Sequence, residues 1–146
     1  MAAIRRAEAT WNGDLMSGSG VVSADSSGVF ENLPITWAAR AETSDGKTSP
    51  EELIAAAHAA CYCMALSNGL SKADTPPTKL EVSATVTFEI GEGGAKVASS
   101  ALTVKGTVPG INYGVFKKAA EAAKDGCPIS KALQGNVKLS VEATLL

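Results

Sequence analysis

Three cysteines are the residues with the clearest capacity for covalent chemistry: Cys61 and Cys63 lie in one segment, and Cys127 lies far along the chain. A thiol attacks as its thiolate, which forms at an ordinary pKa of about 8.5. Cys61 is the first candidate nucleophile. A C-x-C pair on a helix points its two sulfurs to opposite sides, so Cys63 is interpreted as core packing. Cys127 precedes Pro128 and is expected at the N-terminus of a short helix, which favours a thiolate; a small buried residue closing a turn is the alternative.

A cation is needed to ionise Cys61, because the middle of a helix is too far from the N-terminal dipole to lower its pKa much. Arg40 is the clearest candidate, since it stands in the apolar segment W-A-A-R-A and a buried guanidinium needs a partner. An exposed arginine on a strand face is the alternative. Glu51 precedes Cys61 by ten residues, about 15 Å along one helix, and cannot touch that sulfur. It would orient Arg40, come from a partner helix, or serve only the helix N-terminus.

Two other kinds of site are weaker. His58 lies one turn before Cys61 and could act as a base, but a lone helix histidine is more often structural. The three cysteines and the single histidine are spaced unlike the ligands of a zinc site, so we expect no metal.

The helix that must carry Cys61 is predicted over residues 49–69. Ser49 and Glu52 form an S-x-x-E capping box, Pro50 suits the first helical position, and Gly69 suits a left-handed C-terminal cap. Six alanines and the near absence of charge make the helix apolar on every face, which is typical of a helix buried on every face. A membrane span is possible on length alone, but we interpret the segment as the central helix of a globular core.

The remaining chain alternates like strands in most places. Strands are predicted over residues 3–11, 15–24, 34–42, 80–90, 97–108 and 137–145, and a second helix over 112–124. The fold class is therefore α+β with mostly antiparallel sheet, in a single domain over 1–146. One six-stranded sheet covers only one face of the central helix, so we expect a homodimer with two central helices back to back.

Composition limits the partners. The chain has 146 residues, 45% hydrophobic content and a net charge of -2, which gives no reason to expect nucleic acid or a membrane as a partner. The N-terminus is charged within six residues and lacks the apolar segment of a signal peptide. We therefore expect a cytoplasmic protein with reduced thiols.

Two stretches resemble the OsmC/Ohr family of thiol-dependent organic hydroperoxide reductases: P-E-E-L-I-A-A-A-H-A-A-C-Y-C-M-A-L-S and D-G-C-P-I-S-K-A-L. The likeness extends along nearly the whole chain, through A-T-W-N-G-D, V-P-G-I and the last strand. The H-A-A-C helix and the arginine in A-A-R-A-E resemble the OsmC branch more closely than the Ohr branch. The chain departs from the family pattern at Cys63, where family members often carry serine or another small residue.

The resemblance implies an intertwined homodimer with active sites at the subunit interface. It implies that Cys61 is the peroxidatic thiol and Cys127 the resolving thiol, that Arg40 stabilises the Cys61 thiolate, and that Glu51 pairs with Arg40. A sulfenic acid on Cys61 would condense with Cys127 to a disulfide, and an external dithiol, a lipoyl group on a carrier protein in this family, would reduce it. No metal, haem or flavin is implied.

Two alternatives remain. One is a non-catalytic, stress-related ligand-binding protein on the same fold, with inert thiols. The other, a general thiol–disulfide oxidoreductase, is disfavoured because no C-x-x-C is present. Apolar residues, Trp37, Tyr62 and Phe116 among them, are expected around Cys61, where they would favour organic hydroperoxides by burying the organic tail.

Overall fold

The computed structural model describes residues 1–146 and divides them into two compact units, an N-terminal unit of residues 1–53 and a C-terminal unit of residues 54–146. Each unit is described by itself, and a single domain over 1–146 stays a prediction. The fold class is α+β, as predicted. The ten elements in chain order are β1 Glu8–Asn12, β2 Ser19–Ser23, β3 Leu33–Ile35, α1 Trp37–Ala41, α2 Pro50–Lys72, β4 Lys79–Gly91, β5 Gly94–Thr107, α3 Tyr113–Gly126, α4 Pro128–Leu133 and β6 Lys138–Leu145.

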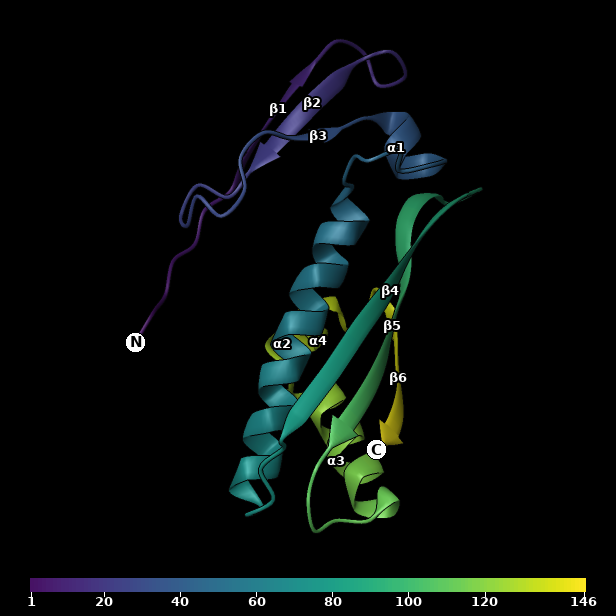
Figure 1. The fold of residues 1–146 in the computed structure, drawn as a ribbon. Helices are drawn as coiled ribbons and strands as arrows, with labels where there is room; N and C mark the ends of the chain where they lie inside the picture. The colour runs from purple at the N-terminus through teal and green to yellow at the C-terminus, as the bar shows by residue number, and fades with distance from the viewer. The chain divides into compact units, whose positions relative to one another are not determined.

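The N-terminal unit holds a small antiparallel sheet in the order β1-β2-β3 (Figure 1). The predicted strand over 34–42 is wrong: β3 ends at Ile35 and α1 begins at Trp37. Thr36 ends the extended segment because its side-chain oxygen accepts the backbone N–H of Ala39 at 3.1 Å, which caps α1. The alanines that follow favour a helix, so Arg40 lies on a helix and not on a strand.

The C-terminal unit contains the second sheet, in the order β4-β5-β6. β4 and β5 form the predicted antiparallel hairpin, but β6 pairs with β5 in parallel. The strands divide into two sheets of three. The prediction of one six-stranded sheet that covers one face of the central helix is therefore wrong. The inward alternation of β6 is confirmed, with Leu139, Val141, Ala143 and Leu145 half-buried and their neighbours exposed.

The central helix α2 starts as predicted and ends later. The backbone N–H of Glu52 donates to Ser49 Oγ at 3.2 Å, while the Glu52 carboxylate accepts the hydroxyl of Thr48 at 2.7 Å. Gly69 lies inside the helix rather than at its end, because Leu70 beyond it is buried in the core. A glycine inside a helix costs about 1 kcal/mol, which the burial of a leucine exceeds.

The core of the C-terminal unit lies where α2 and α3 cover the β4-β5-β6 sheet. α2 contributes a stripe at four-residue intervals, His58, Tyr62, Leu66 and Leu70, each at most 1% exposed. The stripe packs against buried residues of β5 and α3, among them Leu102, Val104, Phe116 and Ala120. Figure 1 shows α2 running beside the β4–β5 hairpin.

Only α2 is long and apolar enough to cross a membrane by length and composition. The core helix of a soluble protein passes the same test, and the buried stripe of α2 serves the core of the C-terminal unit. The other faces of the helix are less covered: Met64, for example, is 67% exposed.

Candidate functional site

The structure brings two of the three thiols together. Cys61 lies on α2 and is half-buried, whereas Cys127 lies between α3 and α4 and is fully buried. The two side chains lie close enough for each to shift the pKa of the other. The two sulfurs predicted to act on one another are therefore neighbours, although they come from segments far apart in the sequence.

Local sequence explains why Cys127 is held where it is. Its backbone N–H donates to the carbonyl of Ala123 at 2.8 Å, which closes α3. It is also the N-cap of α4, with extended φ −60° and ψ 127°, and Pro128 takes the first helical position. Its side chain makes no capping hydrogen bond, but the backbone N–H groups of Ser130 and Ile129 lie near enough to the sulfur to lower its pKa.

The two thiols of this pair differ in acidity. Burial raises the pKa of Cys61, and its hydrogen bond to Cys127 raises it further. Burial also works to raise the pKa of Cys127, but the Ser130 N–H, the Cys61 thiol and the Ser130 hydroxyl together lower it. Cys127 is therefore the more acidic thiol of the pair. Cys61 needs a cation before it can be the ionised partner.

The predicted charged pair is present in the N-terminal unit. The Arg40 guanidinium on α1 donates from Nη2 to Glu51 Oε1 at 2.7 Å and from Nε to both carboxylate oxygens, at 3.1 and 3.2 Å. The Glu51 side chain is 8% exposed and that of Arg40 is 33% exposed. Such a fork-to-fork contact fixes the plane of the guanidinium, and the position of Glu51 in the first turn of α2 adds a favourable helix-dipole interaction.

A cavity of about 320 Å³ adjoins Arg40 within the N-terminal unit. Its walls are mainly apolar and aromatic: Trp11, Leu15, Ile35, Thr36, Trp37, Arg40 and Pro50. A second cavity, of about 870 Å³, adjoins Cys61 between α2 and α3 in the C-terminal unit, with Lys72 and Lys118 among its lining residues. Tyr62 and Phe116, predicted to surround Cys61 as a substrate pocket, are instead fully buried in the core and line neither cavity.

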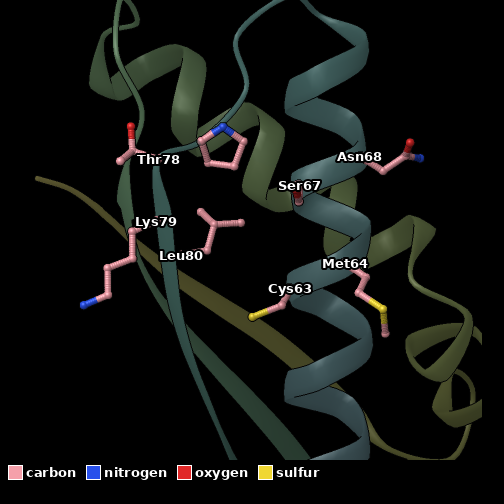
Figure 2. Close-up of a pocket in the computed structure, with 8 residues that line it drawn as sticks. Cys63, Met64, Ser67, Asn68, Thr78, Lys79 and Leu80 are labelled. Carbon is pink, nitrogen blue, oxygen red and sulfur yellow. The ribbon is translucent and has the colours of Figure 1, made fainter.

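Cys63 faces away from Cys61, as its helical position predicts, but it is not a core residue. It is half-exposed and lines a third cavity, of about 510 Å³, between α2 and the start of β4. Figure 2 shows its sulfur pointing from α2 toward the strand, while Met64 points the other way. Burial raises the pKa of the Cys63 thiol, so this sulfur is a weak nucleophile at neutral pH.

His58 is fully buried and both of its ring nitrogens are engaged. Nδ1 lies 2.7 Å from Ser100 Oγ and Nε2 lies 2.8 Å from Ser130 Oγ. Sequence reasoning missed both serines, because nothing in their neighbourhoods marks them as partners of a histidine on another element. In the whole chain no group of three or more histidine, cysteine, aspartate or glutamate side chains is placed to hold a metal ion.

The four predicted site residues therefore form two pairs, Cys61 with Cys127 and Arg40 with Glu51. The first pair belongs to the C-terminal unit and the second to the N-terminal unit. The catalytic roles of all four, and the expected approach of Arg40 to Cys61, stay predictions.

Comparison with known proteins identifies the relatives of this chain. The model of the family described as OsmC-like protein matches residues 43–142. "Peroxiredoxin OsmC" of Escherichia coli (strain K12) is 38% identical over 138 residues, covering 94% of this chain and 95% of that protein. "Organic hydroperoxide resistance protein OhrA" of Bacillus subtilis (strain 168) is 31% identical over 105 residues, covering 70% of this chain and 72% of that protein.

Solved structures agree. The organic hydroperoxide resistance protein OhrB of Bacillus subtilis matches with a TM-score of 0.75 at 28% identity, covering 95% of this chain and 98% of that one. An organic hydroperoxide resistance protein from Elizabethkingia anophelis matches the fold with a TM-score of 0.75 at 24% identity, over the full length of both chains. The matches in sequence and structure, together with the two cysteine segments, show that this chain belongs to the OsmC-like family.

Proposed function

We propose that the protein is a thiol peroxidase that reduces organic hydroperoxides to alcohols through Cys61 and Cys127. The observation that carries this proposal is the proximity of these two side chains in the core of the C-terminal unit. Relatives named peroxiredoxin and organic hydroperoxide resistance protein support the same chemistry.

The cycle has three balanced steps. The Cys61 thiolate attacks the distal oxygen of the hydroperoxide, the O–O bond breaks, and the alkoxide leaves and takes a proton, giving the alcohol and a sulfenic acid. The Cys127 thiolate then attacks the Cys61 sulfur, and the S–O bond breaks as the S–S bond forms. The departing hydroxide takes up the proton released by Cys127 and leaves as water. An external dithiol, such as a lipoyl group, reduces the disulfide by exchange.

Arg40 is the cation proposed to ionise Cys61. Within the C-terminal unit the Cys61 pKa is raised, first by burial and then by Cys127, so the first step needs a positive charge that this unit does not supply to the sulfur. The Arg40 guanidinium, held in one plane by Glu51, is suited to that task and to orienting the peroxide oxygens. The apolar cavity beside it suits the organic group of the substrate.

A second copy of the chain is the proposed partner. On α2 the stripe that includes Tyr62 and Leu66 is buried, but apolar residues on its other faces, such as Met64, are exposed. Helices that are apolar on every face are usually buried on every face. In the proposed homodimer a partner α2 covers these faces. Sedimentation that finds a folded monomer at micromolar concentration contradicts the dimer. The proposed location is the cytoplasm.

A non-catalytic ligand-binding protein is the second candidate, favoured by the raised pKa of Cys61 and by the cavity beside that residue. Alkylation separates the two candidates: reaction of Cys61 at low pH supports the peroxidase, and unreactive sulfurs support the binding protein.

Consumption of cumene hydroperoxide tests the proposal, with a dithiol or a monothiol as reductant. Cys61→Ser should reduce turnover to that of the protein-free control, because the sulfur that accepts the peroxide oxygen is gone. Cys127→Ser should form one equivalent of sulfenic acid with little dithiol-driven turnover. Cys63→Ser is the matched control, because it removes a sulfur two residues from Cys61 that lines a different cavity, and it should turn over normally. Normal activity in Cys61→Ser would refute the assignment.

A further inference from the structure

The single histidine of the chain connects three elements of the C-terminal unit through buried side chains. His58 on α2 lies between Ser100 on β5 and Ser130 on α4, with ring nitrogen to hydroxyl oxygen distances of 2.7 and 2.8 Å. All three side chains are at most 2% exposed. Water is therefore excluded, and the polar atoms of these side chains must find their hydrogen-bond partners within the protein.

Ser130 has a second neighbour. It stands three residues after Cys127, at the start of α4, and both its backbone N–H and its hydroxyl interact with the Cys127 sulfur. The hydroxyl carries only one proton. That proton can be directed at the sulfur or at the imidazole, but not at both.

The state of His58 decides between these directions. Burial lowers the pKa of His58, so the ring is neutral, with one nitrogen donating and the other accepting. A Cys127 thiolate can only accept. The Ser130 hydroxyl then donates to the sulfur, its oxygen accepts from Nε2–H of His58, and Nδ1 accepts the hydroxyl of Ser100. The opposite tautomer turns the Ser130 proton toward Nε2 and away from the sulfur.

We propose that His58 is a positioning residue for Cys127: its Nε2–H holds the Ser130 oxygen so that the Ser130 hydroxyl is directed at the Cys127 sulfur. This inference rests on the proposed function, in which Cys127 attacks the sulfenic acid of Cys61 and hydroxide leaves. Both ring nitrogens of His58 are used by the two serines, so His58 acts on the sulfur through Ser130. Its contribution is to present Cys127 as a thiolate when that attack occurs.

Titration of a single thiol tests the proposal without peroxide. In a Cys61→Ser, Cys63→Ser background Cys127 is the only thiol, and the ultraviolet absorbance of its thiolate is followed against pH. Ser130→Ala and His58→Leu should each lower the thiolate fraction at pH 7 about tenfold, because a hydrogen bond to a charged group is lost. His58→Gln keeps an N–H near the Nε2 position and should restore most of the wild-type titration.

Ser100→Ala is the matched control, since it removes the other hydrogen bond of the same ring without changing Ser130. It should destabilise the fold about as much as Ser130→Ala while leaving the Cys127 titration nearly unchanged. The proposal is overturned if His58→Leu and Ser130→Ala titrate like the background. It is also overturned if His58→Gln behaves like His58→Leu, or if Ser100→Ala shifts the titration equally, because the ring would then be only a structural bridge.

A single turnover gives a second readout in the protein that keeps all its cysteines. After one equivalent of cumene hydroperoxide, trapping with dimedone follows the Cys61 sulfenic acid. In His58→Leu this acid should form at the wild-type rate and convert to the disulfide about tenfold more slowly, by the same loss of thiolate. Equal slowing of both steps would contradict a specific effect on Cys127. A wild-type protein that forms no sulfenic acid would refute the proposed function, and the peroxide-free titration would still decide the role of His58.

Discussion

The two units of this chain differ in what they bury. Residues 54–146 enclose a continuous core of Tyr62, Leu66, Leu102, Phe116 and their neighbours. Among residues 1–53 only Gly20, Ala39 and Glu51 are buried, and large apolar side chains such as those of Leu15 and Val29 are exposed. The thiols thus lie in the C-terminal unit, which has a packed core of its own. The proposed cation, Arg40, lies in the N-terminal unit, whose apolar side chains are largely exposed in the single chain.

This difference separates two tasks that the proposed reaction combines. The C-terminal unit fixes the distance between the sulfurs but raises the pKa of Cys61. The N-terminal unit holds a guanidinium in a defined plane through a nearly buried carboxylate. Substitutions in the core of the C-terminal unit should therefore change the free energy of unfolding, and substitutions at Arg40 in the N-terminal unit should change the reactivity of Cys61.

The largest expected effect is on the core of the C-terminal unit. Leu66→Ala should reduce the free energy of unfolding by about 3 kcal/mol or more, because it removes a fully buried side chain and leaves a cavity. Ile35→Ala, at a half-buried position of β3, is the matched change in the other unit and should cost about 1 kcal/mol. Urea unfolding followed by circular dichroism measures both. Equal costs would erase the distinction between the units.

Arg40→Ala should act on reactivity more than on stability. Loss of a nearby positive charge raises the Cys61 pKa, so alkylation of Cys61 at pH 7 should slow by about tenfold. Arg40→Lys keeps the charge but not the two-pronged contact with Glu51. Its alkylation rate should therefore lie between those of the wild type and Arg40→Ala. The pH dependence of iodoacetamide alkylation, in a Cys63→Ser, Cys127→Ser background where Cys61 is the only thiol, gives the result. A profile that Arg40→Ala leaves unchanged removes Arg40 from the mechanism.

The stability of the C-terminal unit should fall as pH decreases below the ordinary histidine pKa of about 6.5. His58 has a lowered pKa in the fold because it is buried, so the unfolded chain binds the proton first. Between the two pKa values the free energy of unfolding falls by about 1.4 kcal/mol per pH unit. Urea unfolding at a series of pH values measures this slope, and His58→Gln should flatten it. If His58→Gln keeps the wild-type slope, the pH dependence of stability comes from carboxylates and not from His58.

The smallest expected effect concerns one hydrogen bond between two helices. Tyr62 on α2 donates its hydroxyl to the carbonyl of Ala120 on α3 at 2.9 Å, and burial raises the pKa of Tyr62. Tyr62→Phe should cost about 1 kcal/mol of stability and leave the alkylation rate of Cys61 unchanged. Thermal unfolding and the same alkylation assay give the two values. A large change in Cys61 reactivity would show that the thiol pair depends on this contact.

Patterns local in the sequence determined a good part of this protein. The S-x-x-E start of α2, the β4–β5 hairpin and the alternation of β6 were predicted because each rests on residues close together along the chain. The opposite directions of Cys61 and Cys63 follow from helix geometry alone. The N-cap position of Cys127 follows from the proline after it. These features needed no knowledge of which distant segment packs where.

One local pattern was misinterpreted: the segment of Arg40 was predicted as a strand, but the Thr36 cap makes it a helix. Tertiary structure decided the rest. The parallel pairing of β6, the burial of Leu70 beyond Gly69 and the division into two sheets depend on segments far apart in the chain. The same is true of the serines around His58 and of the meeting of Cys61 with Cys127. The sequence names the groups that can react, but only packing between distant elements places one beside another and sets which of them keeps its proton.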